Sequence, residues 1–105
     1  MTPVERRPDH VLRVSGELDI ATVGVLRDAV GKALADAPRV LLVDLTSTRL
    51  DSTGCRELVR TAKAGTAAGV AVEVVAPPDN WRVRRVLDFV QLSAVVPVHD
   101  ALPEP

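Results

Sequence analysis

The sequence predicts a single α/β domain, built as a mixed, mostly parallel β-sheet with helices packed against it. Short apolar runs typical of strands alternate along the chain with segments whose apolar residues recur at helical spacing. Such alternation favours parallel strands joined by right-handed crossovers. The apolar residues make up 47% of the 105 positions and are mostly Val, Leu and Ala, which suits buried parallel strands. No linker or repeat interrupts the pattern, so we predict one domain over residues 1–105, with its core at about 11–102.

The N-terminal part predicts a strand followed by a helix. Val11–Ser15 is the first expected strand, and Val4–Arg7 is a candidate edge strand joined to it by a tight turn that contains Pro8. The segment from Gly16 to Asp19 should break the strand, and Thr22 is a suitable N-cap for a helix that Pro38 ends. The apolar face of that helix is expected to contain Leu26, Ala29, Val30, Ala33, Leu34 and Ala37.

The middle of the chain predicts a buried strand and a second helix. Val40–Leu45 is an almost unbroken apolar run, which is typical of a strand covered on both faces at the centre of a parallel sheet. We expect a polar loop at Thr46–Arg49 and then a helix that ends near Gly69. Its apolar stripe should consist of Cys55, Leu58, Val59, Ala62 and Thr66, with Arg56, Glu57, Arg60 and Lys63 outside it.

The last third predicts a strand, a helix and a further short strand. Val70–Ala76 is the third clear strand, and Pro77 with Pro78 closes it. Val95–Val98 is the expected last strand. Between them, the spacing of Val83, Val86, Leu87 and Val90 indicates a third helix.

Charge and composition exclude several classes of function. The chain has 13 basic and 14 acidic residues, so it lacks the cationic field that holds nucleic acid by its phosphates. Trp81 and Phe89 are its only aromatic residues, too few for base-stacking platforms. The single cysteine, Cys55, fits a reducing compartment, and no segment reaches the roughly 20 apolar residues of a membrane span. We expect a cytoplasmic protein that neither binds nucleic acid nor inserts into a membrane.

The sequence also lacks the usual constellations of an enzyme. It contains no Gly-rich phosphate loop, no nucleophile elbow and no pair of histidines at ligand spacing. His10 and His99 lie at opposite ends of the chain, and each is better explained as an exposed or partly satisfied histidine than as a metal ligand. Cys55 lies on an apolar stripe and is better explained as a small core residue than as a nucleophile. We therefore predict no catalytic residue, no metal and no cofactor.

Two short segments are candidates for a binding site. Asp51-Ser52-Thr53-Gly54 lies between the central strand and the second helix. Its simplest explanation is a helix cap, which is common and stabilises by about 1 kcal/mol. The same place also exposes a hydroxyl at a helix N-terminus, outside the carboxyl ends of the strands, where α/β sheets usually bind ligands. A phosphate there would add about −1.5 to −2 charges at pH 7 and could repel a docking partner.

The second segment is the turn from Gly16 to Thr22. Its simplest explanation is a strand-to-helix turn, with Gly16 for backbone freedom and Thr22 as cap. If the sheet is parallel, this turn also leaves the carboxyl end of a strand, and the two segments then share one edge of the domain.

In this order and spacing, the two segments resemble the signatures of the STAS family, in particular its bacterial anti-sigma-factor antagonists. Gly16-Glu17-Leu18-Asp19 with Thr22 is similar to the first signature, and Val40–Leu45 followed by Asp51-Ser52-Thr53-Gly54 resembles the second. The segment Val83–Leu87, with Leu92, resembles the third helix and the turn after it. The resemblance covers residues from about Val11 to Leu102.

The resemblance implies a phosphorylation-controlled binding protein. In such antagonists, the serine after the signature aspartate is phosphorylated by the anti-sigma factor, a serine kinase with a histidine-kinase-like ATP-binding fold, and that position here is Ser52. The unphosphorylated form would bind the anti-sigma factor, and a PP2C-type phosphatase would restore binding after phosphorylation. Asp19 matches the first-signature aspartate. The residues implied at the contact surface are Asp19, Asp51, Ser52, Thr53, Gly54 and Arg56.

The sequence departs from the family pattern at several positions. Arg49 replaces an apolar or aromatic residue, Cys55 and Arg56 replace a Leu-Gly-type pair, and Trp81 precedes the third helix in an unusual way. Arg49 and Arg56 flank Ser52 and could pair with a phosphate, which would soften a charge switch. The alternative is a STAS scaffold or regulatory subunit, stressosome-like or associated with a lipid-transport ATPase, that phosphorylation does not control. An enzyme of small molecules is disfavoured because the catalytic groups are missing.

Overall fold

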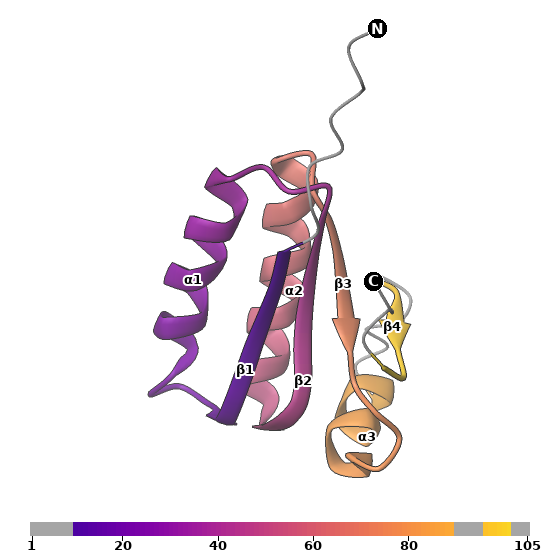
Figure 1. Cartoon of the computed structure of the whole chain (residues 1–105). Helices are drawn as coiled ribbons and strands as arrows, with labels where there is room; N and C mark the ends of the chain where they lie inside the picture. Colours follow the sequence, from indigo (N-terminus) through magenta and orange to yellow (C-terminus); the bar gives the residue numbers. More distant parts are fainter. Residues whose placement is uncertain (1–9, 90–95, 102–105) are drawn as a thin grey trace, which may run out of the picture.

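The computed structural model describes residues 10–89 and 96–101, which form one sheet and three helices (Figure 1). In chain order the elements are β1 (His10–Leu18), α1 (Val23–Ala35), β2 (Val40–Leu50), α2 (Ser52–Ala67), β3 (Ala71–Val75), α3 (Trp81–Phe89) and β4 (Val98–His99). The alternation of strands and helices confirms the predicted α/β class. The candidate edge strand Val4–Arg7, which was the reason to expect a mixed sheet, lies outside the described residues.

The four described strands lie in the order β1-β2-β3-β4, and every neighbouring pair is parallel. In Figure 1, α1 and α2 lie side by side against one face of the sheet, and α3 follows β3 at the carboxyl end of the strands. The carboxyl ends of β1 and β2 and the start of α2 therefore lie at the same edge of the sheet.

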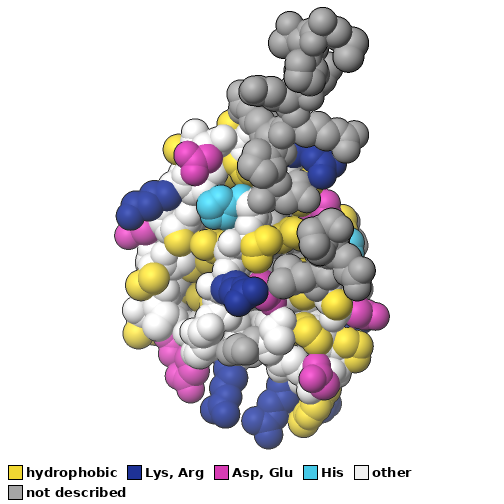
Figure 2. Space-filling model, in the orientation of Figure 1, with side chains coloured by type: hydrophobic (Ala, Val, Ile, Leu, Met, Phe, Trp, Pro, Cys, Tyr) yellow, Lys and Arg dark blue, Asp and Glu magenta, His cyan; other side chains and the backbone are white. Residues whose placement is uncertain are grey.

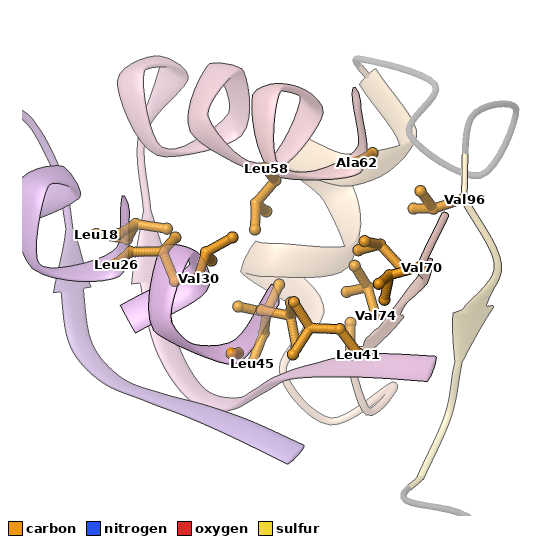
Figure 3. Packing of buried hydrophobic residues seen from close by; sticks show 14 of the residues in the cluster. Leu18, Leu26, Val30, Leu41, Leu45, Leu58, Ala62, Val70, Val74 and Val96 are labelled. Carbon is orange, nitrogen blue, oxygen red and sulfur yellow. The ribbon is translucent and has the colours of Figure 1, made fainter. Parts of the chain in front are cut away.

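The core fills the space between the sheet and the two long helices (Figure 3). Alternate residues of β2 point toward the helices, and Leu41, Val43 and Leu45 are fully buried there. This agrees with the prediction that β2 is a central strand. The side chains that meet them from α1 and α2 are Leu26, Val30, Ala33, Leu58 and Ala62.

Both strands that lead to the candidate site are longer than the sequence predicts. β1 continues through Gly16 to Leu18, and β2 continues through the expected loop Thr46–Arg49 to Leu50. The two extensions pair with each other after a register shift that gives β2 one extra residue, a β-bulge. Gly16 has a φ of 80°, so it adapts the backbone without ending the strand. Thr48 is buried, and a hydrogen bond from its hydroxyl to the carbonyl oxygen of Val14, at 2.5 Å, satisfies the polar group there.

Helix α2 differs from its predicted stripe at two positions. Thr66 is exposed, and its hydroxyl donates to the carbonyl oxygen of Ala62. Glu57 is buried, because α1 places Arg27 Nη2 within 2.6 Å of its carboxylate. The end of the helix agrees with the prediction: Gly69 has a φ of 74°, and its N–H and that of the next residue bond back to the last turn, as in a Schellman motif.

Helix α3 is fixed to the sheet by polar contacts as well as by buried Val83. The side-chain amide of Asn80 donates to the carbonyl oxygens of Leu45 at 3.1 Å, Thr46 at 3.3 Å and Thr48 at 3.0 Å. These carbonyls belong to the bulged part of β2, whose backbone groups do not all find partners in the sheet. The last described strand is Val98–His99, whereas Val95–Val98 was expected, and residues 90–95 lie outside the described part.

Candidate partner-binding site

The two candidate segments begin at neighbouring points of the sheet. Leu18, the last residue of β1, pairs with Leu50, the last residue of β2. Asp19 and Asp51 follow these residues directly, and both line one depression of about 240 Å³. The rest of its lining consists of Glu17, Leu18, Arg49 and Leu50. The structure thus brings the Asp19 turn and the start of α2 to one edge of the domain.

The Asp19 turn is closed by hydrogen bonds from Thr22. The Thr22 hydroxyl oxygen accepts from the backbone N–H of Asp19 at 2.9 Å, and the hydroxyl lies 2.7 Å from the carbonyl oxygen of Glu17. An oxygen of the Asp19 carboxylate accepts from the backbone N–H of Ala21 at 2.9 Å. Thr22 therefore occupies the N-cap position of α1, but its side chain makes no capping bond to that helix. Its function is to hold the turn.

At the start of α2 the two explanations of the Asp51–Gly54 segment apply to different residues. The Asp51 carboxylate accepts from the backbone N–H of Gly54 at 3.0 Å, so Asp51 is the N-cap. Ser52 is the first helical residue and is exposed, and no hydrogen bond engages its hydroxyl within the described part of the chain. Since Asp51 already caps the helix, the Ser52 hydroxyl is not needed for that task. Thr53 is half-buried beside it.

Gly54 is required by the close approach of α2 to the end of β1. A Cβ on Gly54 would lie 2.4 Å from the carbonyl oxygen of Leu18 and 3.1 Å from the Cβ of Leu50. No side chain fits at that distance, because the nearest atom belongs to the backbone. The absence of a side chain lets the N-terminus of α2 rest on the paired ends of the two strands.

The remaining ionisable groups near the site differ in exposure. Arg49 and Arg56 are exposed: the first lines the depression, and the second lies one turn after Ser52 on α2. Cys55 is buried, and burial, with a smaller effect of the Asp51 carboxylate, raises its pKa from 9.0 to about 11. A thiol with so high a pKa is almost wholly protonated at neutral pH, so the core explanation holds for Cys55.

The chemistry of the described residues does not point to a metal site. No group of three or more His, Cys, Asp and Glu side chains within residues 10–89 and 96–101 is placed to bind a metal ion. His99 Nε2 lies 2.5 Å from a carboxylate oxygen of Glu73 on the neighbouring strand, which agrees with a partly satisfied histidine. None of the helices in these ranges is long and apolar enough to cross a membrane.

Asn80 is a residue near the site that sequence reasoning missed. Its three carbonyl partners all lie on β2, more than 30 positions earlier in the chain, so no local pattern announces them. The dipeptide Asp79-Asn80 before a helix signals only a turn or a cap.

Figure 2 shows basic side chains projecting from this edge of the molecule, below the carboxyl ends of the strands as oriented in Figure 1.

The fold and the site define an α/β domain that presents a capped, serine-bearing helix start beside an acidic turn. The family model of the STAS domain matches residues 2–104. The chain belongs to the STAS domain family.

Several known proteins are similar to the chain. The anti-sigma-F factor antagonist RsfB of Mycobacterium tuberculosis is 37% identical over 54 residues, which cover 50% of this chain and 44% of RsfB. A crystal structure of an anti-sigma factor antagonist from Mycobacterium paratuberculosis is 32% identical, with a TM-score of 0.71, and the match covers 88% of this chain and 77% of that one.

The structure of the anti-sigma factor antagonist SpoIIAA in its unphosphorylated form is 21% identical with a TM-score of 0.65, covering 96% of this chain and 86% of that one. At that identity the match supports the fold alone. The aligned stretch spans less than half the length of the curated relative RsfB.

Proposed function

We propose that this STAS domain is an anti-sigma-factor antagonist, which acts by binding an anti-sigma factor and not by catalysis. The relatives from Mycobacterium tuberculosis and Mycobacterium paratuberculosis carry that description, and the second is similar over most of both chains. The observation that carries the proposal is the Ser52 hydroxyl, which is exposed, takes no part in the helix cap and lies next to Asp51, the residue that shares a depression with Asp19. The proposal places the protein in the cytoplasm, where sigma factors act.

The regulatory step is phosphorylation of Ser52 by a partner with serine kinase activity. The Ser52 hydroxyl is accessible. Because Asp51 and not Ser52 makes the capping bond, modification of this hydroxyl costs no structural hydrogen bond. A phosphate there lies at the positive end of the α2 dipole, so the fold tolerates it. Removal of the phosphate by a PP2C-type phosphatase would return the chain to its binding form.

The same phosphate opposes docking for two reasons. It adds about −1.5 to −2 charges beside the carboxylates of Asp19 and Asp51, which already make this part of the edge acidic. It also adds volume at the point where a partner would cover the start of α2. Arg56, one turn further along the helix, would offset part of the charge but none of the volume. Asp51 and Gly54 shape the surface, while Asp19, Thr53 and Arg56 would contact the partner.

The proposal is tested with the serine-kinase anti-sigma factors encoded in the source genome, each purified and titrated against the chain. We expect one of them to bind the unmodified chain and, with ATP, to place one phosphate on Ser52, located by mass spectrometry of the digested protein. Ser52→Asp should weaken the complex by at least about tenfold, while Ser52→Ala should bind like the wild type and accept no phosphate. Thr53→Val should still take its phosphate on Ser52. Thr66→Val, which removes an exposed hydroxyl near the other end of α2, is the matched control and should bind and be phosphorylated like the wild type.

Stability measurements separate a lost contact from a lost fold. Ser52→Asp places a negative charge in the first turn of α2, so its free energy of unfolding should be equal to that of the wild type or higher by about 0.3–1 kcal/mol. A variant that is stable and does not bind supports the switch. Unchanged binding by Ser52→Asp, together with no phosphate on Ser52 with any of the kinases, would refute it and favour the scaffold alternative.

A further inference from the structure

We infer that the surface that docks the anti-sigma factor continues beyond the Ser52 site to the start of α3, where Trp81 and Arg82 recognise an apolar side chain of the partner next to carboxylates. This inference rests on the proposed function and adds a specificity-determining part to it. It starts from an unusual feature of the chain: Trp81, its only tryptophan, is 57% exposed. An exposed tryptophan on a rigid element is typical of a binding hot spot.

Trp81 lies next to the candidate site and not on a separate face. A second depression, of about 330 Å³, is lined by Arg49, Leu50, Asp79, Asn80, Trp81, Arg82 and Val83. Arg49 and Leu50 also line the depression that holds Asp19 and Asp51. The two depressions therefore adjoin at the end of β2, and one continuous partner surface can cover both.

The start of α3 is held rigidly against β2. The three hydrogen bonds of Asn80 fix the residue directly before Trp81, and the backbone N–H of Arg84 donates to the carbonyl oxygen of Asn80 at 3.1 Å. Val83, two residues after Trp81, is 1% exposed. A tryptophan on so fixed a backbone has only two side-chain torsions to order, so it loses little conformational entropy when a partner packs on it.

The exposed arginines around Trp81 indicate which side chains of a partner would complement this surface. The guanidinium of Arg82 lies over the Trp81 ring, 5.4 Å from its centroid, and Arg49 lines the same depression as Trp81. Arg56, on α2, is also exposed. Within residues 10–89 and 96–101 none of these three forms an ion pair, whereas Arg84 pairs with Asp100 at 3.1 Å. The depression at Trp81 is lined by two arginines, Arg49 and Arg82, and by one carboxylate, Asp79, so its charge is positive. The depression at Asp19 is lined by the carboxylates of Glu17, Asp19 and Asp51 and by Arg49 alone as a cation, so its charge is negative.

The complementary segment therefore carries a large apolar side chain that packs on Trp81 and one or two carboxylates that pair with Arg82 and Arg49. Carboxylates suit the two-pronged donor geometry of arginine. A nucleic acid is a poor occupant, because the acidic half of the same edge and the net charge of −1 repel phosphates. The occupant is an acidic, apolar segment of the anti-sigma factor.

Intrinsic fluorescence tests this directly, because the chain contains one tryptophan and no tyrosine. Binding of the anti-sigma factor identified above, or of a form of it without tryptophan, should shift the Trp81 emission to the blue and protect it from acrylamide quenching. Trp81→Ala should raise the Kd at least about tenfold, and Arg82→Glu should raise it about threefold or more, with a weaker dependence on salt. Val11→Ala, another exposed apolar residue at the opposite end of β1, is the matched control and should leave the Kd unchanged.

The outcomes distinguish the two proposals. If Trp81→Ala and Arg82→Glu bind like the wild type while Ser52→Asp does not, the extension to α3 is wrong and the Ser52 switch stands. If no anti-sigma factor binds the wild type, both proposals fail. The Trp81→Ala protein should keep the free energy of unfolding of the wild type within about 0.5 kcal/mol, since the ring is largely exposed. A large loss of stability in Trp81→Ala, together with a wild-type Trp81 emission that does not shift on binding, would contradict the inference.

Discussion

The third residue of α2, Gly54, lies against the last residue of β1, Leu18, so closely that a Cβ on Gly54 would be 2.4 Å from the Leu18 carbonyl oxygen. This contact joins the two halves of the candidate site, because Asp19 follows Leu18 and Ser52 lies two positions before Gly54. The position of one half is thus fixed by the backbone of the other.

Replacement of Gly54 by alanine should be destabilising. The new methyl group would meet backbone, which cannot move aside as a side chain can, so we expect a loss of about 1–3 kcal/mol in the free energy of unfolding. Urea denaturation measures it. Gly31→Ala is the matched control: it lies within α1 with no atom within 4 Å of its Cβ position, and the helix propensity of alanine should stabilise it by about 0.5–1 kcal/mol. Equal stability of the two variants would show that α2 does not touch β1 as described.

Asp51 and Ser52 should respond in opposite ways to truncation. Asp51→Ala removes the N-cap of α2 and should lower the free energy of unfolding by about 1 kcal/mol, whereas Asp51→Asn keeps a capping oxygen and should lose only part of that. Ser52→Ala should stay within about 0.5 kcal/mol of the wild type, because its hydroxyl is exposed and makes no structural bond. Thermal and urea unfolding of the three variants provide the comparison. A larger loss for Ser52→Ala than for Asp51→Ala would assign the cap to the serine.

Asn80 should be one of the most sensitive polar residues. Truncation to alanine leaves the β2 carbonyl oxygens of Leu45 and Thr48 without their donor, at a loss of about 1–3 kcal/mol. Asn80→Asp should lose more than alanine does, because it directs a carboxylate at the same carbonyl oxygens. The exposed neighbour Asp79 is the control, and Asp79→Ala should change stability by less than about 0.5 kcal/mol. If Asn80→Asp had the free energy of unfolding of the wild type, the Asn80 amide would not donate to β2.

Cys55 should be inert at neutral pH. Its pKa is raised to about 11 by burial, so an aromatic disulfide reagent should label it only after unfolding in urea. Between pH 9 and 11 the unfolded chain has released the thiol proton that the folded chain keeps. The free energy of unfolding of the wild type should therefore fall with rising pH across this window, by more than that of Cys55→Ala. Rapid labelling of the folded protein at pH 7 would contradict this.

The sequence predicts the strands and helices well where one type of residue dominates a segment. The apolar run Val40–Leu45 is typical of a covered strand, and Gly69 after an amphipathic stretch marks the end of α2. The longer β1 and β2 could not be foreseen, because Thr46–Arg49 has the composition of a loop. Its strand state depends on pairing with β1, in which Thr48 lies opposite Gly16, and on the hydrogen bond from the Thr48 hydroxyl to the carbonyl oxygen of Val14.

The prediction that Glu57 lies outside the buried face of α2 was wrong for a similar reason. The helical spacing of α2 places it outside the apolar stripe, and only the approach of Arg27 from α1 explains its burial. For the candidate site, the order of the elements was enough to expect Asp19 and Ser52 at one edge of the sheet. The contribution of Asn80 and the position of Trp81 depend on the packing of α3, which no local pattern encodes.

The pairing of Leu18 with Leu50 has a consequence for any ligand of this edge. Because the strands stay paired to their last residues, both segments of the candidate site start from one ladder and hold a fixed spacing. A ligand that spans them loses little free energy to backbone ordering, which is the usual advantage of a preorganised target. A small, rigid designed binder could therefore be matched to this edge as it stands, with side-chain rotamers as the main adjustable element.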